Sequence, residues 1–343
     1  MAALGLLDCK IKVQAQRCEP YSCWVYRQRT SAEFDAELQR LTQVFVACRD
    51  AFFATCDNFH WAPGDGSQAA VDASHLPFPD PAIVKPQGES GHRRVAETLQ
   101  TFIMVASHHL GGLAALHSQA EVLFSPSMLV RAVVENCAHA VWVLGEQGPG
   151  DDPAAAAEKR LARSYLEDLL SAEEGKKNAG RMGGKTSQTY LDAKADYDEL
   201  KAEILTRFPG TTAADLGYRT LLGETLPRLE DCVVAMYDKF HRTLGSTIES
   251  EAAKGAYGFL SNMTHPTLYP ARQLRVWVTD DAHPGHLTSN LTVDADFLRQ
   301  QASAAVIAFY NTLAIVTNHF GWLGPIMGEL TKHIDAAFPE SLA

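Results

Sequence analysis

The feature that most constrains this chain is a set of three helical stretches that are apolar on nearly all sides. Apolar residues fill most positions of 102–116, 128–144 and 302–316, so none of the three has a continuous polar face to turn toward water. A helix of this kind must be covered by other elements on several sides. We therefore expect a mainly α fold, in which these three stretches form the middle of a helical bundle.

Turn and helix signals divide the rest of the chain into further elements. Residues 59–92 are rich in Pro, Gly and Asp and are predicted to form a long loop. Alternating apolar and polar residues within 272–292 predict a small β-hairpin that adds to the bundle. Helical periodicity, with capping residues, prolines or glycines at the ends, predicts helices over 31–58, 93–120, 125–144, 154–177, 187–207, 213–223, 228–248, 250–264, 294–320 and 323–337.

Two regions are expected along the chain. Residues 1–92 hold an N-terminal arm, the first helix and the long Pro/Gly-rich loop, and residues 93–343 form the helical-bundle domain with its small hairpin. Alternation over residues 10–13 predicts a short strand or an extended arm. Glycines within 180–184 predict a hinge between two helices.

Charge and cysteine content restrict the partners and the compartment. The 343 residues include 30 Lys and Arg against 41 Asp and Glu, which gives a net charge of −11 with histidine neutral. An extended nucleic-acid or anionic-membrane surface needs clustered cations, so this balance argues against one but leaves room for a small basic pocket. The seven cysteines are an odd number, no export signal is visible, and no run of 18 apolar residues lacks His or charge. We therefore expect reduced thiols, a cytoplasmic location and no membrane span.

Polar residues inside the helices are the candidates for function. His108 and His109 place two imidazoles on the apolar stretch 102–116. Three further stripes recur at helical spacing: Arg131, Glu135 and His139; Tyr257, Ser261 and His265; and Arg160, Arg163 and Glu167. Because a buried charge is costly unless it is paired, such groups mark either a satisfied structural network or a functional site.

Known catalytic motifs do not occur in the sequence. Gly184-Lys185-Thr186 resembles the end of a phosphate-binding loop, but position 179 holds alanine where that motif needs glycine. No G-x-S-x-G or H-E-x-x-H pattern is present. A carboxylate and an imidazole four residues apart on a helix can contribute to an iron, manganese or zinc centre inside a bundle. The ligand candidates for this alternative are His108, His109, Glu135, His139 and His265.

Two short segments carry a resemblance to known proteins. Arg131-x-x-x-Glu135 on one helix and Leu260-Ser261-x-x-x-His265 on a later one resemble segments of uncharacterised helical bacterial proteins, which are similar in style to the HEPN superfamily. That superfamily comprises helical nucleases and nucleotide-binding proteins of defence and toxin systems. The resemblance spans roughly residues 95–265 and implies a helical bundle that acts as a metal-independent ribonuclease or binds nucleotides. The HEPN pattern places four to six residues between Arg and His, whereas seven separate Arg131 from His139.

Three functions follow from these observations. In the HEPN-like hypothesis Arg131 or Arg163 holds phosphate, Glu135 orients Arg131, and His139 or His265 is the general acid–base, with no cofactor required. Ser261 completes the set of candidate catalytic residues. The alternatives are the metal-dependent enzyme and a non-catalytic protein that binds a ligand or a partner through helix 187–207 and loop 59–92. A homodimer is compatible with all three hypotheses, and no motif in the sequence identifies the substrate.

Overall fold

A computed structural model describes residues 12–18, 23–29, 31–76, 90–146, 148, 150–246, 248–265, 268–279, 287–322 and 324–339. The predicted fold class is confirmed, because helices account for most of the described residues and the strands are short. The helices are α1 (Ala32–Phe59), α2 (Gln68–His75), α3 (Gly91–Ser118), α4 (Ser125–Leu144), α5 (Pro153–Gly183), α6 (Gln188–Arg207), α7 (Ala213–Gly217), α8 (Leu229–Leu244), α9 (Ser250–Thr264), α10 (Leu268–Gln273), α11 (Ala295–Phe320) and α12 (Pro325–Ala337).

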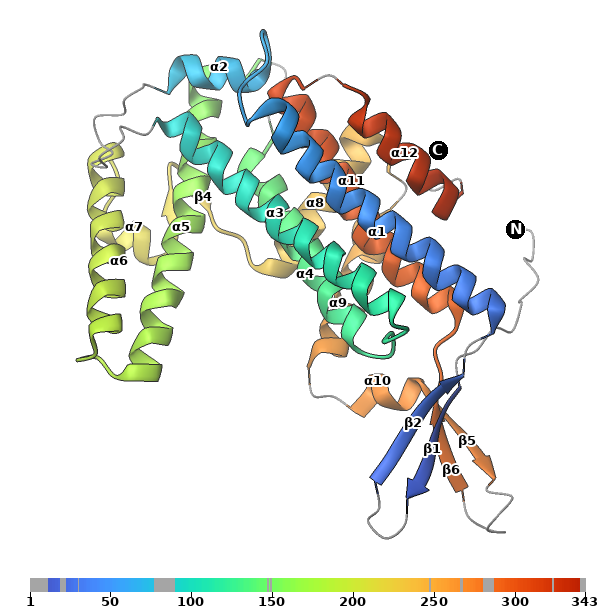
Figure 1. Ribbon diagram of the computed structural model, residues 1–343. Helices are drawn as coiled ribbons and strands as arrows, with labels where there is room; N and C mark the ends of the chain where they lie inside the picture. Colours follow the sequence, from blue (N-terminus) through green and yellow to red (C-terminus); the bar gives the residue numbers. More distant parts are fainter. Residues whose placement is uncertain are drawn as a thin grey trace.

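Helix α4 lies in the middle of the bundle and packs against α3, α11, α8 and α9 (Figure 1). Cys137 of α4 is fully buried, together with Leu113 of α3 and Phe309 of α11. Pro126 stands in the first turn of α4, where its missing N–H leaves no intrahelical hydrogen bond unmade. The predicted bounds of this helix, 125–144, are confirmed.

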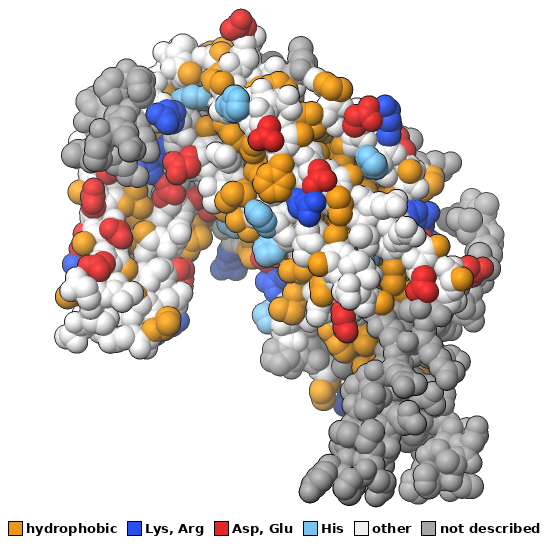
Figure 2. All heavy atoms as spheres, viewed as in Figure 1, with side chains coloured by type: hydrophobic (Ala, Val, Ile, Leu, Met, Phe, Trp, Pro, Cys, Tyr) orange, Lys and Arg blue, Asp and Glu red, His pale blue; other side chains and the backbone are white. Residues whose placement is uncertain are grey.

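Helices α1 and α3 cover one side of α4 and α11. The sequence groups helix α1 with the N-terminal arm. In the structure α1 packs along α3, α11 and α12. It shares their hydrophobic core through fully buried residues such as Phe45. Helix α3 is less enclosed than expected, since Met104 is 38% exposed and His108 is also exposed. The stretch 102–116 is thus covered on several sides, as predicted, but one face of it stays at the surface (Figure 2).

A short helix interrupts the segment predicted as a long loop. Ser67 starts α2 by accepting a hydrogen bond from the backbone N–H of Ala70. The buried Asp72 of α2 then accepts two hydrogen bonds from Arg160 of α5, each 2.6 Å long. The partner of α2 is thus remote in sequence, which is why local composition indicated only a loop. Residues 77–89 of the predicted loop lie outside the described part of the chain.

The helix predicted over 213–223 is shorter than expected. Helix α7 ends at Gly217, and the chain then forms two short antiparallel strands, β3 (Thr220–Leu221) and β4 (Glu224–Thr225). Leu222 and Gly223 join them with φ angles of +51° and +76°, the combination that two-residue hairpin turns require. The prediction of a helix over 213–223 overlooked this turn, for which Gly223 is the sequence signal.

Helices α5 and α6 form an antiparallel arm beside the bundle (Figure 1). Helix α5 extends to Gly183, so the break before α6 lies at Gly184 and not earlier in the predicted hinge 180–184. Helix α6 packs mainly on α5, and only Glu203 and Ile204 of α6 are buried. The polar helix predicted over 187–207 is confirmed, with most of its surface exposed.

Four strands form an antiparallel sheet at the end of the bundle away from the arm (Figure 1). Their order is β2 (Cys23–Arg29), β1 (Lys12–Cys18), β6 (Leu287–Leu291) and β5 (Arg275–Thr279). The hairpin predicted within 272–292 is confirmed as β5 and β6. The strand expected over residues 10–13 begins at Lys12, and the residues before it lie outside the described part of the chain.

Two helices in the described part of the chain, α3 and α4, are long and apolar enough to cross a membrane by length and composition. In the structure both pack inside the bundle, where 39% and 56% of their most apolar windows are buried. The core helices of soluble proteins show the same composition, so this finding alone does not place either helix in a membrane.

Acid should destabilise the fold through two buried histidines. Burial lowers the pKa of His117 and that of His319 to about 4, from an ordinary value of 6.5. Below about pH 6.5 the unfolded chain therefore binds protons that the folded protein binds only near pH 4. The free energy of unfolding should fall by about 1.4 kcal/mol per pH unit for each histidine as the pH drops through this window. Denaturant titrations at several pH values measure the slope.

His117→Gln should lower this slope by about 1.4 kcal/mol per pH unit, because glutamine does not titrate. Replacement of the exposed His333 with glutamine is the matched control for loss of a histidine. An unchanged slope in the His117 variant would show that another group causes the acid sensitivity.

Candidate functional site

The first and second predicted stripes meet across the contact between α4 and α9. Arg131 donates from Nε to Glu135 Oε1 (2.5 Å), from Nη1 to Thr264 Oγ1 (2.5 Å) and from Nη2 to the Tyr257 hydroxyl (3.2 Å). That hydroxyl donates to Glu135 Oε1 at 2.9 Å. All three guanidinium nitrogens are therefore occupied, and Glu135 offsets the charge. One N–H on Nη1 and one on Nη2 are not used by these three hydrogen bonds.

Ser261 and His265 lie at the same end of α9 but outside this network. Ser261 is half-buried and His265 is exposed, and neither side chain has a hydrogen bond to any described residue. The Ser261 carbonyl accepts a hydrogen bond from the Thr264 hydroxyl, which also binds Arg131. The structure thus places both residues next to the Arg131 network, which Ser261 joins through its carbonyl and not through its side chain.

His139 continues the α4 stripe but has a different partner. Its Nδ1 lies 2.6 Å from Oε1 of the buried Glu167 on α5. The imidazole also stacks on Phe102 of α3, with ring centroids 5.3 Å apart. The Glu167 carboxylate and the Phe102 ring together fix the orientation of the His139 imidazole. The predicted Arg131–Glu135–His139 ladder is therefore two separate networks on one helix.

Of the third stripe, on α5, Arg163 lies against the end of α4. Arg163 donates from Nε to Glu224 Oε2 at 2.8 Å, and its guanidinium lies so close to Gly145 that a Cβ there would be 1.4 Å from Nη1. Lys239 donates to the Gly145 carbonyl. Burial, followed by the charges of Arg163 and Arg160, lowers the pKa of Lys239 to about 8. Cations at a helix C-terminus interact favourably with its dipole, which gives this cluster a structural role.

The predicted metal ligands are not gathered at one place. His108 is exposed and meets the edge of the Phe53 ring, whereas Glu135 and His139 belong to the two networks above. In the described part of the chain, no three His, Cys, Asp or Glu side chains are close enough to hold a metal ion. The metal-centre hypothesis with His108, His109, Glu135, His139 and His265 as ligands stays a prediction from the sequence.

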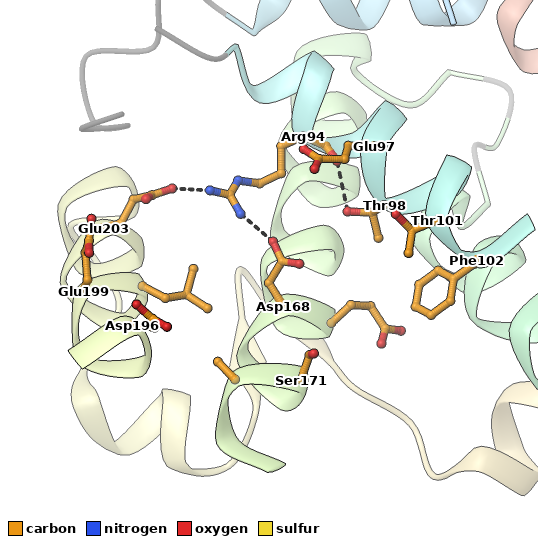
Figure 3. A pocket seen from close by; sticks show the side chains of 13 residues that line it. Arg94, Glu97, Thr98, Thr101, Phe102, Asp168, Ser171, Asp196, Glu199 and Glu203 are labelled. Atoms are coloured by element: carbon orange, nitrogen blue, oxygen red, sulfur yellow. Dashed lines mark hydrogen bonds and ion pairs between the residues drawn. The ribbon is translucent and has the colours of Figure 1, made fainter. Parts of the chain in front are cut away.

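A cavity of about 470 Å³ lies between α3, α5 and α6 (Figure 3). Arg94 of α3 reaches across it: the guanidinium pairs with Asp168 of α5 and donates from Nη2 to Glu203 Oε1 of α6 at 2.5 Å. It also lies over the Tyr165 ring, 4.1 Å from the centroid, and the Tyr165 hydroxyl donates to the same Glu203 oxygen at 2.7 Å. Three helices thus meet on one buried arginine.

Carboxylates dominate the wall of this cavity. Arg94 is the cation among its lining residues. Six carboxylates line it as well: Glu97, Glu167, Asp168, Asp196, Glu199 and Glu203. Asp168 and Glu203 pair with Arg94, and Glu167 pairs with His139. The other three, Glu97, Asp196 and Glu199, are exposed and have no ion pair or hydrogen bond with a described residue. The cavity therefore has a surplus of negative charge.

The sequence prediction missed this cavity, although one signal was present. Asp196, Glu199 and Glu203 are spaced i, i+3 and i+7, which places them on one face of a helix. A carboxylate face on a polar helix is normally solvated, and only the packing of α6 on α5 turns it toward α3. Of the predicted site residues, Glu167 alone lines the cavity.

Replacement of Arg94 by methionine should destabilise the protein by about 3–5 kcal/mol, because it leaves the buried Glu203 without its cation. Urea denaturation measures the loss. Adding Glu203→Gln should recover most of it, since the buried charge is then removed as well. Arg49→Met is the control, because Arg49 pairs with Asp50 at the surface and such pairs contribute about 0–1 kcal/mol. Equal losses in the Arg94 and Arg49 variants would contradict this account.

Comparison with protein-family models, with curated protein sequences and with solved structures finds no match for this chain. The HEPN-like resemblance of the sequence therefore stays a prediction.

Proposed function

We propose that this protein binds an organic cation, such as a di- or polyamine, in the cavity between α3, α5 and α6. The observation that carries the proposal is the surplus charge of its wall, where Glu97, Asp196 and Glu199 have no partner among the described residues. Carboxylates that surround a concave site attract cations and raise their local concentration. This corresponds to the ligand-binding alternative from the sequence, with helix 187–207 as one wall.

The arrangement favours an extended organic cation over a metal ion. The carboxylates come from three helices. Among the described residues, no three of them lie close enough together to bind one metal ion. A ligand with two or more separated ammonium groups can reach several of them. Phe102 lies in the same wall and offers an aromatic face for a cation or an alkyl chain.

The buried part of the cavity provides the polar contacts that fix orientation. Thr98 and Glu167 lie on the inner wall and are buried. The Thr98 hydroxyl is 2.6 Å from the Ser164 hydroxyl, and Glu167 is held by His139. The cavity therefore combines buried, hydrogen-bonded polar groups with exposed carboxylates, and small-molecule sites commonly use a few placed polar groups in this way.

Isothermal titration calorimetry with putrescine and spermidine tests the proposal on the full chain. We expect spermidine to bind more tightly than putrescine, n-butylamine to bind least, and affinity to fall with added salt. The double variant Asp196→Asn/Glu199→Gln should weaken spermidine binding about tenfold, which corresponds to about 1.4 kcal/mol.

A control separates the cavity from the overall charge of the chain. Asp57→Asn/Glu121→Gln removes two exposed carboxylates from other parts of the surface and should leave affinity unchanged. Equal weakening by both double variants would show that spermidine is bound only by the general negative field. Absence of heat for all three amines would overturn the proposal.

The HEPN-like ribonuclease is a second hypothesis, supported by Ser261 and His265, which stand unbonded beside the Arg131 network. If it is correct, purified protein should cleave RNA without a metal, and His265→Ala should abolish cleavage by removing a general acid–base. His333→Ala is the control for loss of an exposed histidine. Cleavage that persists in Arg131→Ala would contradict the assigned phosphate-holding role.

A further inference from the structure

A second cavity, of about 730 Å³, lies between the end of α1 and the first turns of α3. The turn that follows α1, with His60 and Trp61, forms one side of its wall, and one face of α3 from His92 to Gln100 forms the other. Glu97 lines this cavity as well as the one between α3, α5 and α6, whereas the other lining residues of the two cavities differ. None of the candidate residues from the sequence lines it.

The turn after α1 is a firmly held part of this wall. His60 and Trp61 have φ angles of +49° and +57°, in the left-handed region that bulky side chains rarely adopt. The Trp61 indole N–H donates to Cys56 Sγ at 3.3 Å, and the Trp322 indole N–H donates to the Ala62 carbonyl at 2.7 Å. Strained residues held in this way occur often at ligand sites. Because the donor of Trp61 is already used, its ring offers a ligand an aromatic surface.

His92 is the buried polar side chain of the cavity. It is only 8% exposed, and it has no hydrogen bond to any described residue. Burial lowers the pKa of His92, although the charge of Asp72 partly opposes this shift, so the imidazole is neutral near pH 7. A neutral imidazole offers one N–H donor and one nitrogen acceptor. Buried polar groups are normally hydrogen-bonded, so His92 calls for a partner that the described chain does not supply.

Gln100 repeats this pattern eight residues further along the same face of α3. Its side chain is half-buried, and the amide has no hydrogen bond to a described residue. Like the imidazole of His92, the amide offers both a donor and an acceptor. Arg93 and Glu97 lie on the same wall without an ion pair to any described residue, and their charges cancel. With histidine neutral, the lining residues therefore carry no net charge.

We propose that this cavity binds a neutral heteroaromatic compound whose ring edge carries both hydrogen-bond donors and acceptors, as in a nucleobase or its nucleoside. The ring would stack on Trp61, and its edge would bind the imidazole of His92 and the amide of Gln100. The volume lies within the range of small-molecule sites. A phosphate would gain little, because Glu97 repels it as Arg93 attracts it. The proposal is independent of the organic-cation site, since it uses none of the carboxylates that carry that proposal.

Isothermal titration calorimetry of the full chain with adenosine, guanosine, cytidine and uridine tests the proposal. At least one nucleoside should bind, and N-methylindole, a planar ring without a polar edge, should bind about tenfold more weakly because it makes neither hydrogen bond. The matching nucleoside monophosphate should bind no more tightly than the nucleoside. Gln100→Met should weaken nucleoside binding about fivefold, and His92→Phe should have a similar effect, since each removes one hydrogen bond and keeps a side chain of similar size.

Two control variants separate this cavity from the rest of the surface. Gln300→Met replaces an exposed glutamine of α11 and should leave nucleoside affinity unchanged. Asp196→Asn/Glu199→Gln alters only the organic-cation site and should also leave it unchanged, so the two proposals fail separately. Gln100 is half-buried, so its variant tests the site even if the buried His92→Phe variant does not fold, which far-UV circular dichroism checks.

Four results would overturn the proposal. The first is that none of the four nucleosides binds, and the second is that N-methylindole binds as tightly as the best of them. The third is that Gln100→Met and Gln300→Met have equal nucleoside affinities. The fourth is that the nucleoside monophosphate binds at least about tenfold more tightly than the nucleoside, which would show a site for anions instead of a neutral ring.

Discussion

Helix α4 is apolar on nearly every side, and it is removed from water only because α3, α11, α8 and α9 surround it. A fully buried aliphatic side chain stabilises a fold by roughly 1.5–3 kcal/mol, and α4 carries several of them. Because α4 must be covered by apolar faces of other helices, those helices take the central positions and the polar elements lie at the edges of the bundle. Helix α1 and α12 close the bundle, whereas α5 and α6 project from it as an arm.

The arm is attached to the bundle through buried charges. Arg94 joins α3 to both arm helices, Arg160 joins α5 to α2, and Arg163 lies against the end of α4. A buried ion pair adds little net stability, because desolvation opposes the attraction, but one partner without the other is strongly unfavourable. These pairs therefore determine where the arm sits more than how stable the protein is. At the cavity, the packing of α6 on α5 and the pairing of Glu203 with Arg94 together place α6 opposite α3.

Charge is distributed unevenly between the two ends of the molecule. The arm and the neighbouring face of α3 carry the unpaired carboxylates of the cavity, whereas the strands at the opposite end carry cations and aromatic residues. The two ends are separated by the length of the bundle (Figure 1). The proposed organic-cation ligand follows from the unpaired carboxylates of the cavity, which the net charge of the whole chain does not locate.

The sequence by itself determined the fold class, the bounds of α4 and α9, the polar character of α6 and the β5–β6 hairpin, because periodicity and capping act over a few neighbouring residues. It also identified the pairing of Arg131 with Glu135, which are one helical turn apart. Only the tertiary structure decided that His139 pairs with Glu167 and that Asp72 belongs to a helix held by Arg160. It likewise decided that Asp196, Glu199 and Glu203 face Arg94, which lies more than a hundred residues away from them in the sequence. The physical reason is that a charge on a helix can be solvated or paired with almost any partner, and packing of the apolar faces selects which partner comes within reach.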